Sequence, residues 1–216
     1  MNVTDVFSDQ TYLVLPTKTN PRVYLAVDNH KMTINAFKLY NPFSKKAKVL
    51  KAVATFLSLY CNPLLKLLLP TIKTDNSSFI KFLEGKLNKE LISSVYLATA
   101  KDKVVLQLQN SNRILGYLKY PLTEQGKERL IKEEKGILVL AKMNLVPNLI
   151  LSGTYEKSPF ILLKNLEGTI GEVKDEEYVT VLKALKKSTS FRLENHPRIL
   201  NLQSKLIQYS LTDFTN

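Results

Sequence analysis

The sequence predicts an α+β protein with a five-stranded antiparallel sheet and one packed helix, a helical N-terminal extension and a helical C-terminal tail. Three observations predict it: evenly spaced strands between residues 94 and 120, an amphipathic segment from about 123 to 143, and apolar runs at 149–151 and 160–163. Strands joined by tight polar turns are typical of an antiparallel meander. The expected segments are 1–91 for the extension, 92–168 for the sheet and 169–216 for the tail.

The extension opens with two short expected strands. Residues 12–15 form an apolar run closed by Pro16, and residues 23–27 form a second run. The dipeptide Asn20-Pro21 between them is a turn signal, because proline fixes φ and keeps the preceding residue out of the helical region. A polar stretch at 28–31 follows the second strand.

A basic helical segment is expected from Ser44 to Ile72. Ser44 is placed as the helix N-cap, and Pro63 should end or kink the helix near Cys61. Six lysines and no acidic residue lie between Ser44 and Lys73. The segment is interpreted either as two packed helices with lysine stems in solvent or as an amphipathic surface on an anionic membrane. A membrane-spanning helix is a third interpretation, disfavoured because polar residues interrupt the apolar run.

The remaining elements follow the apolar periodicity along the chain. A capping loop at 75–78 precedes a short helix at 79–91. The expected sheet and tail elements are strands at 94–98, 104–109, 113–120, 149–151 and 160–163, a helix at about 123–143, and helices at 175–188 and 199–209.

Composition excludes several classes of protein. The chain is 44% apolar and 23% charged, as in a globular protein with a real core. A single cysteine, Cys61, excludes a disulfide framework and a cysteine-based zinc site, and two histidines are too few for a histidine-rich metal centre. Residues 1–10 are polar and lack the apolar core of a signal peptide. The expected location is the cytoplasm, with peripheral membrane association as an option.

Positive charge is concentrated in the first half of the chain. The net charge is +12; residues 1–120 carry 17 Lys and Arg against 7 Asp and Glu, and residues 121–216 carry 14 against 12. Such asymmetry indicates an acidic partner such as nucleic acid, anionic lipid or a phosphorylated molecule. The simpler interpretation is that lysine-rich helices keep the protein soluble. Nucleic acid is disfavoured because the five arginines are scattered and no recognition motif is present.

The order of three strands, one helix and two strands resembles the smaller lobe of the protein-kinase-like fold. Residues 114–119 are similar to the lysine strand of the aminoglycoside phosphotransferase and choline kinase-like families, and Glu134 with Leu138 is similar to their glutamate helix. Residues 160–168 resemble their fifth strand and hinge. Residues 12–16, 20–22 and 39–42 bear a looser resemblance to kinase-like proteins of bacterial surface-polysaccharide loci.

The resemblance implies ATP and magnesium as cofactors and a small hydroxylated substrate. Lys119 would hold the nucleotide phosphates and Glu134 would orient that lysine, with the adjacent Glu133 as the alternative partner. Backbone groups near Lys164, Asn165 and Leu166 would meet the adenine ring. No catalytic residue is assigned by the resemblance.

The sequence also departs from the family pattern. The turn at 99–103, where a phosphate loop is expected, contains no glycine. The histidine–glycine–aspartate catalytic loop is missing; the nearest match, Asp213-Phe214, lies beside the last residues given. We therefore expect a truncated or diverged nucleotide-binding lobe, inactive by itself. The alternative is a non-catalytic interaction module that binds an anionic membrane or an acidic partner through its basic N-terminal half.

Overall fold

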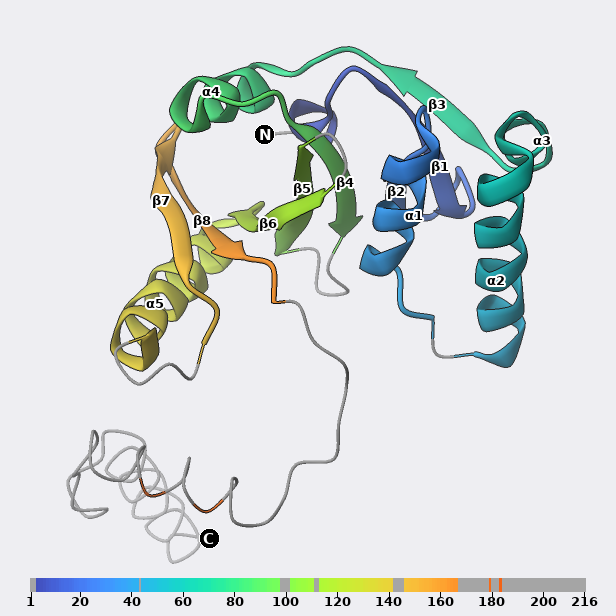
Figure 1. Ribbon diagram of the computed structural model, residues 1–216. Coiled ribbons are helices and arrows are strands. Elements are labelled where there is room, and N and C mark those ends of the chain that lie inside the picture. The colour runs from blue at the N-terminus through green and yellow to red at the C-terminus, as the bar shows by residue number, and fades with distance from the viewer. Residues whose placement is uncertain are drawn as a thin grey trace, which may run out of the picture. The chain divides into compact units, whose positions relative to one another are not determined.

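The computed structural model describes residues 3–42, 44–97, 102–110, 113–141 and 146–166, and the single positions 179 and 183. The chain divides into two compact units, residues 1–167 and 168–216. Every element described below belongs to the first unit (Figure 1). The helices expected at 175–188 and 199–209 fall on residues that, apart from those two single positions, lie outside the description.

Eight strands form one antiparallel sheet, so the predicted five-stranded sheet is wrong. Their spatial order is β3-β1-β2-β4-β5-β6-β8-β7. The strands are β1 (Gln10–Pro16), β2 (Pro21–Ala26), β3 (Thr71–Thr74), β4 (Ile92–Leu97), β5 (Lys103–Asn110), β6 (Arg113–Pro121), β7 (Leu149–Tyr155) and β8 (Ser158–Lys164).

The five predicted strands are present as β4 to β8, and the error concerns where the sheet ends. β2 pairs with β4 through Val23–Tyr96 and Tyr24–Val95, and β1 and β3 extend the sheet beyond β2. If β4 were an edge strand, a row of its backbone N–H and C=O groups would have no hydrogen-bond partners. Strand β2 supplies these partners. The strands of the extension and those of the predicted lobe therefore share one sheet.

Five α-helices accompany the sheet among the described residues, in place of the one packed helix predicted beside it. They are α1 (His30–Leu39), α2 (Lys45–Tyr60), α3 (Asn62–Leu68), α4 (Ser78–Leu87) and α5 (Glu124–Ala141), preceded by a 3₁₀ turn, η1 (Val3–Val6). Helix α1 departs from the sequence prediction, which has only a polar stretch at 28–31 after the second strand. Its signal was Asn29, whose side chain accepts a hydrogen bond from the Lys31 N–H at 2.9 Å and caps the helix.

The predicted start and interruption of the basic helical segment are confirmed. The Ser44 side chain accepts a hydrogen bond from the Ala47 N–H at 3.2 Å and caps α2. Helix α2 ends at Tyr60, and α3 begins at Asn62 with Pro63 in its first turn. Proline is tolerated there because the first N–H groups of a helix have no intrahelical acceptor. The predicted helix extended to Ile72, but residues 71–74 form β3 instead.

The two faces of the sheet are covered by different helices. Tyr12 of β1 packs in a core cluster with residues of η1 and α4, whereas the next residue, Leu13, packs in a cluster with residues of α1, α2 and α3. Successive residues of a strand point to opposite faces, so these two clusters lie on opposite sides of the sheet. Figure 1 shows α1, α2 and α3 beside β1 and β2.

Helix α5 lies on the same face as α1, α2 and α3. A row of directly opposed partners crosses the sheet through Val23, Tyr96, Val105, Lys119 and Ile161. Opposed partners in an antiparallel sheet share a face. Val23 packs in the cluster with α1 to α3, and Ile161 packs in the cluster with α5. The row therefore places Lys119 on the face that α5 covers.

Candidate functional site

The Lys119 side chain forms an ion pair with Glu133. Lys119 lies near the end of β6, and Glu133 lies in the middle of α5, the helix that follows β6. The structure thus gives Lys119 the partner that the sequence offered as the alternative. No hydrogen bond or ion pair links Glu134 to Lys119 among the described residues. The side chains of Lys119 and Glu133 are 25% and 28% exposed, so the pair is accessible from solvent.

A second lysine shares the Glu133 carboxylate. The Lys103 ammonium, at the start of β5, lies 3.4 Å from a carboxylate oxygen of Glu133. Burial raises the pKa of Glu133, but the hydrogen bonds and charges of Lys119 and Lys103 outweigh burial and leave the pKa below its ordinary value of 4.5. Two ammonium groups on one carboxylate leave the cluster of Lys103, Lys119 and Glu133 with a net positive charge, which favours an anionic ligand.

Two further contacts hold α5 against the sheet beside this cluster. The Arg129 guanidinium lies 2.7 Å from the Asp102 carboxylate, which is mostly buried. Gly126 lies so close to the Asp102 backbone that a Cβ atom at this position would be 2.2 Å from the Asp102 carbonyl oxygen. Glycine is therefore required where the helix approaches the sheet. These contacts fix where Glu133 lies relative to Lys119.

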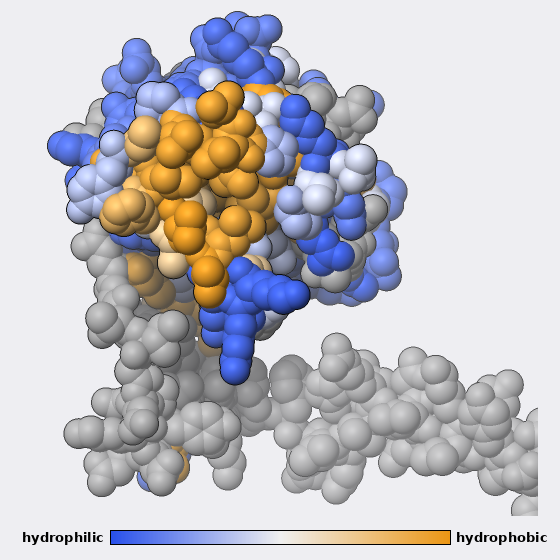
Figure 2. Space-filling view, turned by 90° about the vertical axis from the view of Figure 1, so that its right-hand side faces the viewer, coloured by the Kyte–Doolittle hydropathy of each residue, from blue (hydrophilic) through white to orange (hydrophobic). Residues whose placement is uncertain are grey.

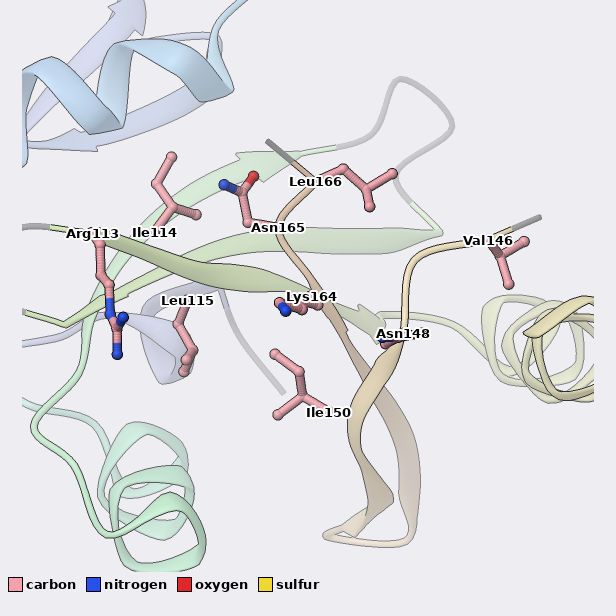
Figure 3. A pocket seen from close by; sticks show the side chains of 9 residues that line it. All are labelled: Arg113, Ile114, Leu115, Val146, Asn148, Ile150, Lys164, Asn165 and Leu166. Carbon is pink, nitrogen blue, oxygen red and sulfur yellow. The ribbon is translucent and has the colours of Figure 1, made fainter. Parts of the chain in front are cut away.

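A pocket of about 730 Å³ lies at the end of the sheet where β6 begins and β8 ends (Figure 3). Three of the five predicted site residues, Lys164, Asn165 and Leu166, line it. The remaining lining residues come from the start of β6 and from the segment that enters β7: Arg113, Ile114, Leu115, Val146, Asn148 and Ile150.

Backbone hydrogen bonds fix the chain around the pocket. The Lys164 N–H donates to the Asn148 carbonyl at 2.8 Å, and the Asn165 N–H donates to the Leu115 carbonyl at 3.3 Å. Gly116 of β6 also lies against β8, where an added Cβ would be 2.2 Å from the Leu163 carbonyl oxygen. The end of β8 is thereby held between its neighbours.

The lining residues of the pocket combine positive charge with apolar surface. Arg113 and Lys164 are its two charged residues, and none of the lining residues is acidic. Figure 3 shows the Arg113 and Leu115 side chains pointing to one side of the sheet and the Ile114 and Asn165 side chains to the other. This composition suits a ligand with an apolar or aromatic part and an anionic part.

The pocket and Lys119 share one strand but not one cavity, since Lys119 is not a lining residue. Leu115 packs in the core cluster that includes residues of α4, on the face opposite Lys119, and Figure 3 shows Ile114 on the other side from Leu115. Ile114 is therefore the lining residue of β6 on the Lys119 face, and the five-residue separation of the two positions corresponds to about 16 Å along an extended strand. Between them, Tyr117 is opposed by Gln107 of β5, and the Gln107 amide lies 3.4 Å from the Tyr117 hydroxyl. Lys119 and the pocket therefore form two parts of the candidate site.

A buried polar row next to Lys119 was missed by the sequence interpretation. The Gln109 amide donates to the Met32 carbonyl of α1 and to the Gln107 side chain, both at 3.3 Å. Both glutamines are fully buried, and the Gln109 side-chain oxygen has no hydrogen-bond partner among the described residues. The available signal was glutamine at alternate positions of an apolar strand, where one face is expected to be apolar.

Other expected features are placed as follows. Residues 98–101, most of the turn without glycine, lie outside the described residues, as does Asp213. Within the part of the chain that the structure describes, no three His, Cys, Asp or Glu side chains come together as a metal site. No helix among those residues is long and apolar enough to cross a bilayer.

Comparisons of the chain with protein-family models, with curated proteins and with solved structures found no match.

Proposed function

We propose that strands β4 to β8 and helix α5, as part of the eight-stranded sheet, carry a nucleotide-binding site like that of kinase-like phosphotransferases, in a chain truncated or diverged so that it does not transfer phosphate by itself. The observation that carries the proposal is the ion pair between a strand lysine, Lys119, and a glutamate of the next helix, Glu133. In kinases this pair aims the lysine at the α- and β-phosphates. The chain order of β4, β5, β6, α5, β7 and β8 is the order on which the resemblance rests.

The charge balance around Lys119 also supports phosphate binding. A lysine paired one-to-one with a glutamate is neutral overall, whereas here Lys103 adds a second positive charge. The pKa of Glu133 is held low, so its carboxylate stays ionised and keeps Lys119 in position at neutral pH. A polyphosphate would then meet a pre-aimed ammonium in a net positive setting.

The pocket at the end of β8 would receive the base of the nucleotide. Its residues fit this role because Ile114, Val146 and Leu166 offer apolar surface and Asn165 offers an amide. A separation of about 16 Å along β6 between Ile114 and Lys119 is of the order of an extended nucleoside triphosphate. Magnesium would reach the site with the nucleotide, because Mg²⁺ binds phosphate oxygens directly and keeps several waters.

Thermal unfolding with and without Mg-ATP tests the proposal. A ligand at 100 times its Kd stabilises a protein by about 2.7 kcal/mol, which raises Tm by about 5–10 °C for a chain of this size. Lys119→Ala should remove most of this rise. Lys132→Ala, which removes an exposed lysine of α5, is the matched control and should retain it.

Two results would contradict the proposal. One is the absence of any Mg-ATP shift in the parent protein. The other is an equal shift in the parent and in a folded Lys119→Ala variant, which would place the nucleotide away from Lys119. Circular dichroism of the variant without ligand establishes whether it is folded.

A further inference from the structure

Helices α2 and α3 present an unusually apolar outer surface. Six large residues on it are each at least 50% exposed: Val49, Val53, Phe56 and Tyr60 of α2, and Leu67 and Leu68 of α3. Figure 2 shows a continuous hydrophobic area on the side of the molecule where Figure 1 places α2 and α3. Isolated exposed apolar residues are ordinary, but a continuous patch marks an interaction surface.

The apolar residues of α2 form a stripe that faces away from the sheet. Positions 49, 53, 56 and 60 are separated by four, three and four residues, which is one face of an α-helix. The residues of α2 that are buried, Ala54 and Ser58, lie on its other side. Four large apolar side chains of α2 therefore point outward, while Ala54, Ser58 and the partly buried Leu57 face the rest of the protein.

The charged residues of the segment that carries this stripe are all lysines. Lys45, Lys46 and Lys48 in the first turn of α2 are exposed and have no ion-pair partner among the described residues. The sequence from Ser44 to Lys73 contains no acidic residue. Two other lysines of the segment do not add free positive charge to this surface. Lys51 donates a hydrogen bond to the Tyr40 carbonyl at 2.5 Å, and Lys66 forms an ion pair with Asp28 at 2.7 Å.

We propose that the outer surface of α2 and α3 docks on an anionic lipid bilayer. The stripe would enter the boundary between headgroups and acyl chains, and the three lysines would meet lipid phosphates and carboxylates. Phe56 and Tyr60, whose rings are 4.8 Å apart, suit this boundary because tyrosine has an apolar ring and a polar hydroxyl. A second copy of the chain fits less well, since the same segment of a second copy, Ser44 to Lys73, offers no acidic residue to meet these lysines.

Sedimentation with lipid vesicles tests the proposal on the full chain. We expect binding to phosphatidylcholine vesicles that contain about 30% phosphatidylserine, and much weaker binding to phosphatidylcholine alone. Replacing Lys45, Lys46 and Lys48 with Gln should weaken binding to the anionic vesicles by about two orders of magnitude. Phe56→Ser with Leu67→Ser should weaken binding by at least about tenfold, because both lose buried apolar area.

Matched control variants distinguish binding through the surface of α2 and α3 from binding that depends only on the total charge or hydrophobicity of the protein. Replacing Lys81, Lys86 and Lys89 with Gln removes the same charge from exposed positions in and after α4 and should leave binding unchanged. Leu138→Ser changes an exposed leucine of α5 and should also leave it unchanged. The proposal is overturned if the parent binds neither vesicle, or if the control variants weaken binding as much as the test variants. Self-association that Phe56→Ser abolishes, without vesicle binding, would also overturn it in favour of a second copy.

Discussion

Glu133, and not its neighbour Glu134, accepts the hydrogen bond that the Lys119 ammonium donates from β6 to α5. Adjacent helical residues point about 100° apart, so only one of the two carboxylates can face the strand. The buried side of α5 runs through Gly126, Leu130 and Ile137, and Glu133 continues that series at helical spacing. Leu138, the residue that led the sequence interpretation to Glu134, is 49% exposed and lies off this side.

Glu133→Gln should therefore reduce nucleotide binding and Glu134→Gln should not. The amide keeps the size of the side chain but removes the charge that aims Lys119. We expect the Mg-ATP shift in Tm to fall by at least half in Glu133→Gln and to equal the parent value in Glu134→Gln. Thermal unfolding of the three proteins checks this, and an equal effect of the two substitutions would contradict the assignment.

The stability contributed by Glu133 should disappear at acidic pH. Its pKa is lower in the folded protein than the ordinary value of 4.5, so the unfolded chain binds the proton more tightly. The contribution is then fully present above about pH 4.5 and is lost as the pH falls through the folded pKa. Urea unfolding of the parent and of Glu133→Gln should show a difference in unfolding free energy near neutral pH that shrinks toward zero below pH 4.5. A difference that does not depend on pH would exclude the charge as its source.

The same substitution at two glycines of α5 should have opposite effects on stability. Gly126→Ala places a Cβ atom 2.2 Å from the Asp102 carbonyl oxygen, so helix and sheet must separate. We expect a loss of about 1–3 kcal/mol, as for other overpacked sites. Gly136 has nothing within 4 Å of an added Cβ, and Ala there should stabilise the helix by up to about 1 kcal/mol. Urea unfolding measures both, and destabilisation by Gly136→Ala would contradict the described packing of α5.

Two lysines of α2 that look alike in the sequence should differ in their effect on stability. Lys51 donates to the Tyr40 carbonyl, and its partial burial lowers its pKa. Lys51→Gln should cost about 1 kcal/mol because it removes a hydrogen bond from a charged donor. Lys48 is exposed, so Lys48→Gln should change stability by less than about 0.5 kcal/mol. Equal effects in urea unfolding would show that Lys51 also lies free in solvent.

Local sequence patterns predicted most elements but not the extent of the sheet. The strands from β4 to β6 were found because alternation and tight polar turns are short-range signals. The pairing of β2 with β4 was not predicted, because four helices and one strand separate the two strands along the chain. A local sequence pattern carries no information on which distant strands pair. Strand β3 is only four residues long and directly follows an apolar helical segment, so an alternation of apolar and polar residues typical of a strand could not be recognised there.

The candidate site shows the same division between local and long-range information. Lys119 and the residues at 164–166 were found from a strand and its end. Arg113 and Asn148 were missed because they meet Lys164 only through the placement of β8 between β6 and β7. Of the six lysines between Ser44 and Lys73, the sequence could not tell that Lys51 and Lys66 bind partners within the protein.

The order of strands in the sheet bears on how the chain folds as it is synthesised. From β1 to β6 each new strand adds to the edge of an existing one, and β7 and β8 join as a hairpin through β8. Because the ribosome releases the N-terminal part first, the sheet can grow outward from β1 and β2 without inserting a strand between two that are already paired. The free edge of β2 is the one that waits longest, because β4 emerges only after α1, α2, α3, β3 and α4, and this is the interval in which a nascent chain could pair with another molecule.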